Sequence, residues 1–352
     1  MPLQRVILSV AKDLAEGFVM KLRIATRKSA LALAQTTQAA DEIVAANRSF
    51  FADEKVGGNC ADGGDCAGLS YELVSMTTEG DRRLDKSLAS FGGKGVFIKE
   101  LEVALLEGRA DIAIHSLKDM PAEVLPQFKL AAVLKREDPR DAFLARGGVA
   151  GIRFMDLPAG AKVGTGSIRR VVQLKALRPD LEYVPIRGNI QTRISKLAEL
   201  DGVVLAAAGL NRMGLTDQVT EYFSTEQMLP ASGQGILAIE TLRQPEELCV
   251  ETILSRVNHV PTFCIAVAEM AFLKALDAGC QFPVASFAEF EKDAIGDVRT
   301  LKIRGIYWDE SSSRLLRAET SREIHMNESN TLEESKALGV ALAELIKKQL
   351  AE

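Results

Sequence analysis

Polar side chains, nearly all of them basic or hydroxyl-bearing, recur in this sequence directly after short apolar segments that are typical of β-strands. The residues of this set are Arg27 and Ser29 after RIAT, Lys118 and Asp119 after DIAIH, Thr165, Ser167, Arg169 and Arg170 after KVG, Arg187 and Arg193 around GNIQT, and Arg212 after AAAGL. In an open α/β sheet the carboxyl ends of neighbouring strands face one crevice, so these side chains are expected to converge there. Guanidinium groups bind carboxylates and phosphates through paired N–H donors, and helix N-termini add backbone donors. The pattern therefore predicts a binding site for a polyanion.

Each of these residues also has a purely structural explanation. Most arginines are solvated or pair with surface carboxylates. Asp119 either neutralises Lys118 or a neighbouring arginine, or it meets a substrate N–H group or a developing cation. A nucleotide is disfavoured as the anion because the sequence has no phosphate-binding loop of the GxxxxGK[ST] type, and GTGSIRR lacks its lysine and its spacing. The segment 81–96 is either a plain charged linker or a lid that carries Lys94.

The cysteines do not form a metal or disulfide pattern. They are Cys60, Cys66, Cys249, Cys264 and Cys280. Because there is no C-x-x-C pair and no nearby histidine, no metal site is expected. Cys280 lies on the turn of LDAGCQFPVASF, where a thiol is accessible, and it is either reactive or a harmless free cysteine. The histidines are too scattered for a catalytic triad, and His115 is expected to be a structural histidine on an apolar strand.

Composition places the chain among soluble globular proteins. It has 352 residues, of which 47% are hydrophobic, 26% charged and 5% aromatic, and a formal net charge of -5. This length predicts two or three domains, and the acidic balance argues against a general affinity for nucleic acid or anionic membranes. Because no apolar run approaches the roughly 18 residues of a membrane helix and no secretory signal is evident, a cytoplasmic protein is expected. The missing signal also disfavours an exported, non-enzymatic anion-binding protein.

The order of the expected elements predicts an α/β fold. Strands alternate with helices from KLRIAT (21–26) to GVVLAAAG (202–209), and near-continuous aliphatic strands are typical of parallel sheets covered on both faces. The charged segment KREDPRDAF has the composition of a domain crossing, which divides this region into two doubly wound lobes. Beyond Pro261, one long helix, several strands and a final helix from about 331 predict a third, smaller α+β domain.

Several longer motifs occur together in a consistent order from Leu22 to the C-terminus. The motifs are LRIATRKSALALAQ, GGKGVFIKELEVALLEGRADIAIHSLKDMPAE, KREDPRDAF, GTGSIRR, RPDLEYVPIRGNIQTRISKL, AAAGLNRMGL, LPASGQG and GCQFPVASFAE. This set resembles the porphobilinogen deaminase family, also called hydroxymethylbilane synthases. The resemblance implies a transferase that joins four porphobilinogen molecules head to tail, with release of ammonia, to give hydroxymethylbilane in the biosynthesis of tetrapyrroles such as haem, chlorophyll and corrins.

The same resemblance implies roles for individual residues. Cys280 matches the cysteine that carries a dipyrromethane cofactor through a thioether, and Asp119 matches the catalytic aspartate, expected to hydrogen-bond pyrrole N–H groups and to stabilise cationic intermediates. The acetate and propionate groups of the growing chain account for a cationic crevice. The residues expected to bind cofactor and substrate are Arg27, Ser29, Lys94, Lys118, Thr165, Ser167, Arg169, Arg170, Arg187, Gly188, Arg193, Arg212 and Gln234.

The family architecture further implies lobes that resemble type II periplasmic binding proteins and are joined by two crossover segments. The expected division is an N-terminal extension at 1–20, domain 1 at 21–136 and 236–254, domain 2 at 140–232, and domain 3 with the cofactor loop at 258–352. We expect a monomer that acts on the small molecule porphobilinogen, without nucleic-acid or membrane partners. Ala278 and Lys28 depart from the commonest family pattern, and the Gly-rich segment near 56–68 has no assigned role.

Overall fold

The computed structural model describes residues 20–52, 68–78, 98–148, 152–244, 248–278, 283–291, 297–326 and 328–352. Two residues with expected roles, Cys280 and Lys94, lie outside the described residues. So do nearly all of the expected extension (1–20) and of the Gly-rich segment (56–68). Within the described part of the chain, no helix is long and apolar enough to cross a membrane.

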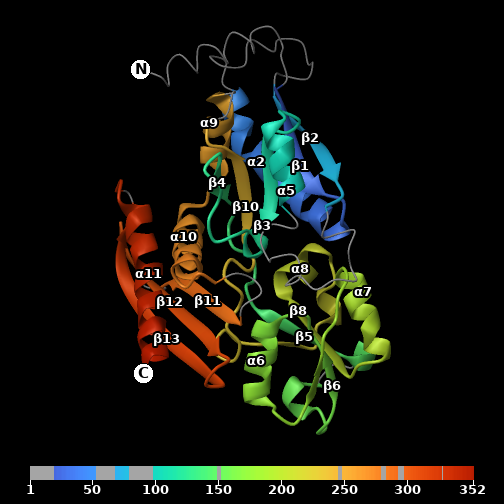
Figure 1. Cartoon of the computed structure of the whole chain (residues 1–352). Coiled ribbons are helices and arrows are strands. Elements are labelled where there is room, and N and C mark those ends of the chain that lie inside the picture. The colour runs from blue at the N-terminus through green and yellow to red at the C-terminus, as the bar shows by residue number, and fades with distance from the viewer. Residues whose placement is uncertain are drawn as a thin grey trace.

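The first lobe is built on a five-stranded sheet (Figure 1). Its strands, in spatial order, are β2 (Leu69–Met76), β1 (Met20–Arg27), β3 (Ile112–Ser116), β10 (Leu237–Leu242) and β4 (Phe128–Val133). Three helices pack on it, namely α2 (Ala30–Ala52), α5 (Lys99–Leu106) and α9 (Leu248–Val257). Side chains alternate between the faces of a strand, so Leu22 and Ile24 pack toward α2 and α9, while Ala25 packs toward α5. Helices therefore cover both faces of this sheet, as its aliphatic strands predict.

The second lobe repeats this arrangement in a separate five-stranded sheet (Figure 1). Its order is β7 (Glu182–Val184), β6 (Lys162–Gly164), β8 (Gly202–Ala206), β5 (Asp141–Ala145) and β9 (Glu221–Tyr222). Its parallel strands are each followed by a helix, namely α6 (Ile168–Leu177) after β6, α7 (Ile190–Ser195) after β7 and α8 (Ala207–Arg212) after β8. Each helix begins just beyond the carboxyl end of a strand, which is the edge where ligands bind in open α/β sheets.

The two sheets are mixed, whereas the aliphatic strands predicted parallel sheets. β10 runs antiparallel to β3 and β4, and β5 runs antiparallel to β8 and β9. In the register, Leu237 lies opposite Ser116, and Asp141 lies opposite Ala206, so β10 and β5 start where their neighbours end. The reason is that the chain enters each of these strands from the other lobe, through the crossing segments 134–140 and 229–236. A strand that starts at the crevice edge runs away from the crevice.

The C-terminal unit has the expected α+β architecture (Figure 1). Its antiparallel strands are β11 (Val284–Phe290), β12 (Val298–Asp309) and β13 (Arg314–His325), and its helices are α10 (Val260–Ala275) and α11 (Thr331–Ala351). Phe272, Leu301 and Leu342 belong to the core between the sheet and the helices. The close packing of the two helices requires Gly339, because a Cβ at that position would overlap the backbone of Ala268.

One buried carboxylate joins the C-terminal unit to both crossing segments. Glu269 of α10 is 0% exposed and accepts a hydrogen bond from Arg136 Nη1 at 2.7 Å. It also accepts backbone N–H bonds from Gly233 and from Ala288 of β11. Arg136 belongs to the first crossing segment and Gly233 to the second. Glu269 therefore connects the C-terminal unit to both crossing segments through hydrogen bonds.

Candidate functional site

The turn after β3 places a lysine and an aspartate side by side. Leu117 is 1% exposed, and its N–H donates to the second crossing segment at 3.0 Å, which anchors the 3₁₀ turn Leu117–Asp119. Lys118 is half-buried, and its Nζ donates to Gln234 Oε1 at 3.3 Å. Asp119 is exposed. The turn therefore directs its cation toward the second crossing and leaves its carboxylate accessible.

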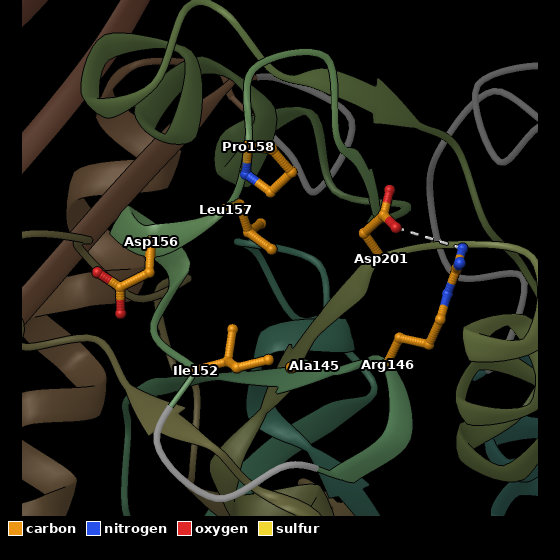
Figure 2. A pocket seen from close by; sticks show the side chains of 7 residues that line it. All are labelled: Ala145, Arg146, Ile152, Asp156, Leu157, Pro158 and Asp201. Carbon is orange, nitrogen blue, oxygen red and sulfur yellow. Dashed lines mark ion pairs between the residues drawn. The ribbon is translucent and has the colours of Figure 1, made fainter.

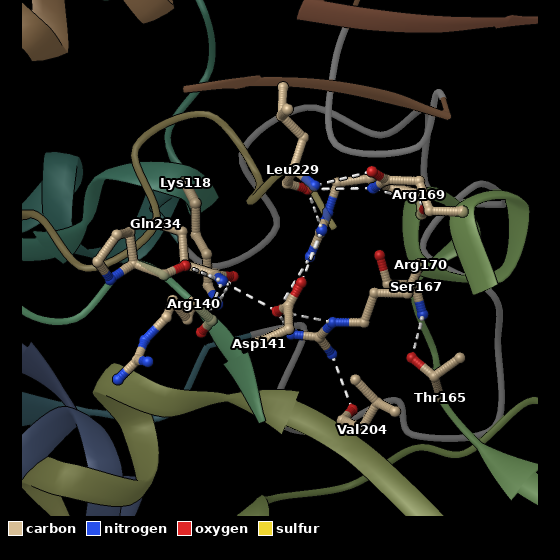
Figure 3. Close-up of polar contacts among 12 residues, drawn as sticks. Lys118, Arg140, Asp141, Thr165, Ser167, Arg169, Arg170, Val204, Leu229 and Gln234 are labelled. Carbon is tan, nitrogen blue, oxygen red and sulfur yellow. Dashed lines mark hydrogen bonds and ion pairs between the residues drawn. The ribbon is translucent and has the colours of Figure 1, made fainter. Parts of the chain in front are cut away.

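A buried carboxylate in the second lobe holds two of the predicted arginines (Figure 3). Asp141, the first residue of β5, accepts hydrogen bonds from Arg169 Nη1 at 2.8 Å and from Arg170 Nη2 at 2.7 Å. Arg169 also donates to the Leu229 carbonyl, and Arg170 donates to the Val204 carbonyl. Both guanidinium groups are thus fixed by the protein itself, and Arg169 Nε is buried without a partner among the described residues.

Arg169 and Arg170 belong to the first turn of α6, and Ser167 and Thr165 lie just before it (Figure 3). Ser167 is the N-cap residue, and its N–H donates to Thr165 Oγ1 at 3.4 Å. The Ser167 hydroxyl makes no capping hydrogen bond within the described chain. Because the first N–H groups of a helix have no intrahelical acceptor, the start of α6 can bind a carboxylate next to the arginines.

The start of α7 brings a third arginine to the site. Asn189 caps the helix by accepting the Thr192 N–H at 2.8 Å, and Arg193 Nε donates to the Gly188 carbonyl at 2.8 Å. Gly188 has a φ of +105°, and a Cβ there would lie 2.7 Å from the Thr192 side chain. The turn therefore requires glycine, and this turn sets the direction of the Arg193 side chain.

The pKa shifts indicate which charges interact across the crevice. Burial lowers the pKa of Arg193, and the charge of Arg170 lowers it further, as does that of Arg187. Asp119 raises the pKa of Arg193. Asp119 belongs to the first lobe and these arginines belong to the second, so charges from both lobes meet at one place.

The same crowding of cations affects Lys118. Burial lowers the pKa of Lys118 from 10.5 to about 8, and the charges of Arg170 and Arg169 act in the same direction, against Asp119 and Asp141. Burial alone would raise the pKa of Asp141, but the two arginines hold it well below its usual range. Cations outnumber carboxylates among these interacting groups, so the binding of a polyanion would relieve their repulsion.

Arg212, another residue of the predicted set, joins the two lobes. It ends α8, and its Nε donates to Gln38 Oε1 of α2 at 3.3 Å. Its Nη2 donates to the Gly235 carbonyl at 3.0 Å. Burial lowers the pKa of Arg212, and the nearby carboxylates of Glu137 and Glu42 oppose this shift. Arg212 therefore contacts the first lobe and the second crossing segment directly.

The end of β1 supplies the remaining described residues of the set. Arg27 is half-buried, and Ser29 Oγ accepts the Ala32 N–H at 3.3 Å where α2 begins. The neighbouring Lys28 lines a pocket of about 570 Å³ on the first lobe, together with Lys99. The structure thus brings together the predicted residues of the turn after β3, of α6, of α7 and of the second crossing, and it places Arg27 and Ser29 at the adjoining strand end.

Another pocket, of about 310 Å³, lies at the far end of the second sheet (Figure 2). Ala145 lines it, together with Arg146 and Asp201, which form an ion pair at 3.4 Å. Because Asp141 begins β5 and Ala145 ends it, the length of a strand separates this pocket from the crevice. None of the predicted site residues that the structure describes lines this pocket.

Sequence reasoning missed Asp141 as part of the site. The available signal was an acidic residue directly before an apolar strand in KREDPRDAF, because a carboxylate that starts a buried strand needs a partner. The predicted structural role of His115 is confirmed. Its Nε2 lies 2.9 Å from Glu240 Oε2, and both side chains are buried.

The chain matches known proteins along most of its length. The family model described as porphobilinogen deaminase, dipyromethane cofactor binding domain, matches residues 22–250, and that described as porphobilinogen deaminase, C-terminal domain, matches residues 263–348. The porphobilinogen deaminase of Syntrophus aciditrophicus is 44% identical over 327 residues, which cover 92% of this chain and 94% of the relative. That of Clostridium kluyveri is 43% identical over 290 residues, which cover 82% of this chain and 89% of the relative.

Among solved structures, the periplasmic VFT2 domain of BvgS from Bordetella pertussis is similar over 72% of this chain and 91% of that chain. The TM-score is 0.36 and the sequence identity is 13%.

Proposed function

Because the chain belongs to the porphobilinogen deaminase family, we propose that porphobilinogen units are joined in the crevice between its lobes. The reaction of the family is a group transfer, the stepwise head-to-tail condensation of four porphobilinogen molecules with release of ammonia. It gives hydroxymethylbilane for tetrapyrrole biosynthesis. The dipyrromethane cofactor bound by the family domain at 22–250 supplies, when present, the terminal pyrrole carbon to which the first unit is added.

The charges of the crevice fit such a cofactor and its substrate, because each pyrrole ring carries an acetate and a propionate group. Lys118 and the neighbouring arginines carry more positive charge than Asp119 and Asp141 neutralise. Arg169 Nε is a buried donor without a partner among the described residues. A substrate carboxylate would supply the missing acceptor and the missing negative charge. The convergence of these cations from both lobes is the observation that carries the proposal.

We assign the binding of cofactor and substrate to the predicted set. The set is Arg27, Ser29, Lys94, Lys118, Thr165, Ser167, Arg169, Arg170, Arg187, Gly188, Arg193, Arg212 and Gln234. The bonds of Arg170 to Asp141 and of Arg193 to Gly188 support this assignment, because they orient the guanidinium groups before a ligand binds. Cys280, which lies between α10 and β11 in the sequence, is the proposed thioether attachment point of the cofactor.

Asp119 is the proposed catalytic residue. Its carboxylate is exposed beside Lys118 and interacts electrostatically with Arg193 of the other lobe. From this position it can accept a hydrogen bond from a pyrrole N–H and stabilise the positive charge that develops as the amino group leaves. Lys118, with a pKa of about 8, is largely charged at neutral pH and can bind a carboxylate next to that reacting ring.

Finer features of the protein are proposed on the same basis. They are a division into domain 1 (21–136 and 236–254), domain 2 (140–232) and domain 3 (258–352), a monomeric state, a cytoplasmic location and a product used for haem and related tetrapyrroles. The position of β10 between β3 and β4 supports the division, because it returns the chain to the first sheet.

Intact-mass spectrometry of the protein after reconstitution with porphobilinogen tests this function. We expect a covalent adduct two pyrrole units heavier than the encoded chain, and formation of hydroxymethylbilane in solution. Cys280→Ser should carry no adduct, whereas Cys264→Ala, which changes a buried thiol in the core of the C-terminal unit, should keep it. A bare polypeptide mass in reconstituted protein that also fails to consume porphobilinogen would refute the proposal.

A further inference from the structure

Asp141 receives hydrogen bonds from three side chains at once (Figure 3). Its Oδ1 accepts from Arg170 Nε at 3.0 Å and from Gln234 Nε2 at 2.9 Å, and its Oδ2 accepts from Arg169 Nη1 at 2.8 Å. None of these four residues is more than 5% exposed. We call Asp141, Arg169, Arg170 and Gln234 the Asp141 network.

Gln234 extends the Asp141 network to the first lobe. Its Nε2 donates to Asp141 and to the Pro139 carbonyl, at 2.9 and 2.7 Å, while its Oε1 accepts from Lys118 Nζ at 3.3 Å. One amide thus donates to a carboxylate on one side and accepts from an ammonium group on the other. A continuous path of polar contacts runs from the arginines of α6 to the lysine that precedes Asp119 (Figure 3).

The charge of Asp141 determines how the two guanidinium groups can be arranged. Two buried like charges side by side repel each other strongly, because the low dielectric screens them little. One carboxylate between Arg169 and Arg170 cancels one of the two positive charges and leaves the other for a ligand. The carboxylate also occupies the Nη groups of Arg169, whose Nε remains without an acceptor among the described residues.

We propose that Asp141 is a positioning residue for the condensation reaction. It orients Arg169 and Arg170 toward the carboxylates of the pyrrole chain and, through Gln234, holds Lys118 beside Asp119. Asp141 is 0% exposed, so it acts through these side chains and does not touch the substrate. The inference rests on the proposed function, because it assigns a role within the same site.

A positioning role has a consequence that a purely structural role lacks, because the Asp141 charge acts on the titration of Lys118. The charged groups that face Lys118 are Asp119 from its own turn, Asp141 from β5, and Arg169 and Arg170 from α6. Without the Asp141 charge, the two arginines repel the Lys118 ammonium group with less opposition, and Lys118 loses its proton at lower pH. The alkaline limb of the pH dependence of kcat/KM reports this change.

Asp141→Asn keeps the shape of the side chain and removes its charge. For the holoenzyme acting on porphobilinogen, we expect kcat/KM to fall about 10- to 100-fold, mainly through a higher KM, and the alkaline limb to move to lower pH by about 1 unit. Asp180→Asn is the matched control, because Asp180 binds both Nε and Nη2 of Arg178 just beyond the other end of α6. Asp180→Asn should keep the kcat/KM of the wild type and the position of its alkaline limb.

Two results for Asp141→Asn would overturn the inference. One is a wild-type pH profile with a wild-type kcat/KM. The other is a lower kcat/KM with an alkaline limb that has not moved, since that outcome indicates a structural role alone. Turnover by the wild type is the reference for both, and its absence would instead refute the proposed function.

Gln234→Met provides a second test if Asp141→Asn does not fold. It removes the amide that connects Lys118 to Asp141, but it leaves the ion pairs of Asp141 in place. We expect the circular dichroism spectrum of the wild type, and an alkaline limb again at lower pH because Lys118 has lost an acceptor. A folded Gln234→Met variant with an unmoved alkaline limb would overturn the inference.

Discussion

Replacement of Lys118 by methionine should separate the contribution of this residue to substrate binding from its effect on the stability of the folded protein. Burial lowers the pKa of Lys118 from 10.5 to about 8, and Arg170 and Arg169 add to the effect. The folded protein therefore disfavours the charged lysine, although Asp119 and Asp141 oppose the shift. Methionine has a similar length and carries no charge, so Lys118→Met removes the unfavourable burial of the ammonium group.

The size of the expected stabilisation follows from the shift in the pKa of Lys118. The fall of the Lys118 pKa from 10.5 to about 8 corresponds to a destabilisation of the folded state by about 3 kcal/mol at neutral pH. Because the side chain is partly exposed, this value is an upper bound. Loss of the hydrogen bond to Gln234 costs about 1 kcal/mol. We therefore expect Lys118→Met to be more stable than the wild type by about 1 to 2 kcal/mol at pH 7, which raises Tm by about 1 to 3 °C.

The pH dependence of this difference has a definite sign. Because the pKa of Lys118 is lower in the folded than in the unfolded state, the unfolded chain binds more protons between pH 8 and 10.5. The destabilisation of the wild type by its buried ammonium group therefore decreases as the pH rises through this window. The stability advantage of Lys118→Met should be complete at pH 7 and should shrink toward pH 10.

Thermal unfolding monitored by circular dichroism, at pH 7 and at pH 10, measures the difference in stability between Lys118→Met and the wild type. In parallel, kcat/KM for porphobilinogen should fall about 10- to 100-fold, because a charged donor to a substrate carboxylate is lost. Lys162→Met is the control, since Lys162 is exposed on β6, and its Tm should stay within about 1 °C of the wild type. The reasoning is refuted if Lys118→Met is the less stable protein at pH 7, or if its advantage persists unchanged at pH 10.

Two further substitutions test the junction of the three units and the catalytic carboxylate. Glu269→Ala leaves Arg136 buried without its partner, so we expect a loss of about 3 to 5 kcal/mol in urea unfolding, against less than about 1 kcal/mol for Lys274→Ala, which breaks an exposed pair on the same helix. Equal losses would contradict this role of Glu269. Asp119→Ala should retain part of its covalent adduct by intact mass while kcat falls at least about 100-fold, and normal product formation would remove Asp119 from the mechanism.

The sequence by itself determined the kinds of element and the places where the strands end. KLRIAT and GVVLAAAG predicted strands that the structure contains as Met20–Arg27 and Gly202–Ala206. Polar residues directly after such strands could be recognised because a strand end is a local feature, set by the change from apolar to polar side chains. The order of the motifs identified the family, which the matches over 22–250 and 263–348 confirm.

Only the tertiary structure decided the direction of β5 and β10 and the partners of the buried arginines. Arg169 lies 28 residues from Asp141 in the sequence, and Arg136 lies 133 residues from Glu269. No local pattern relates such residues, because their contact depends on where the crossing segments enter each sheet. A buried guanidinium group must meet a carboxylate once water is excluded, but the path of the whole chain determines which carboxylate that is.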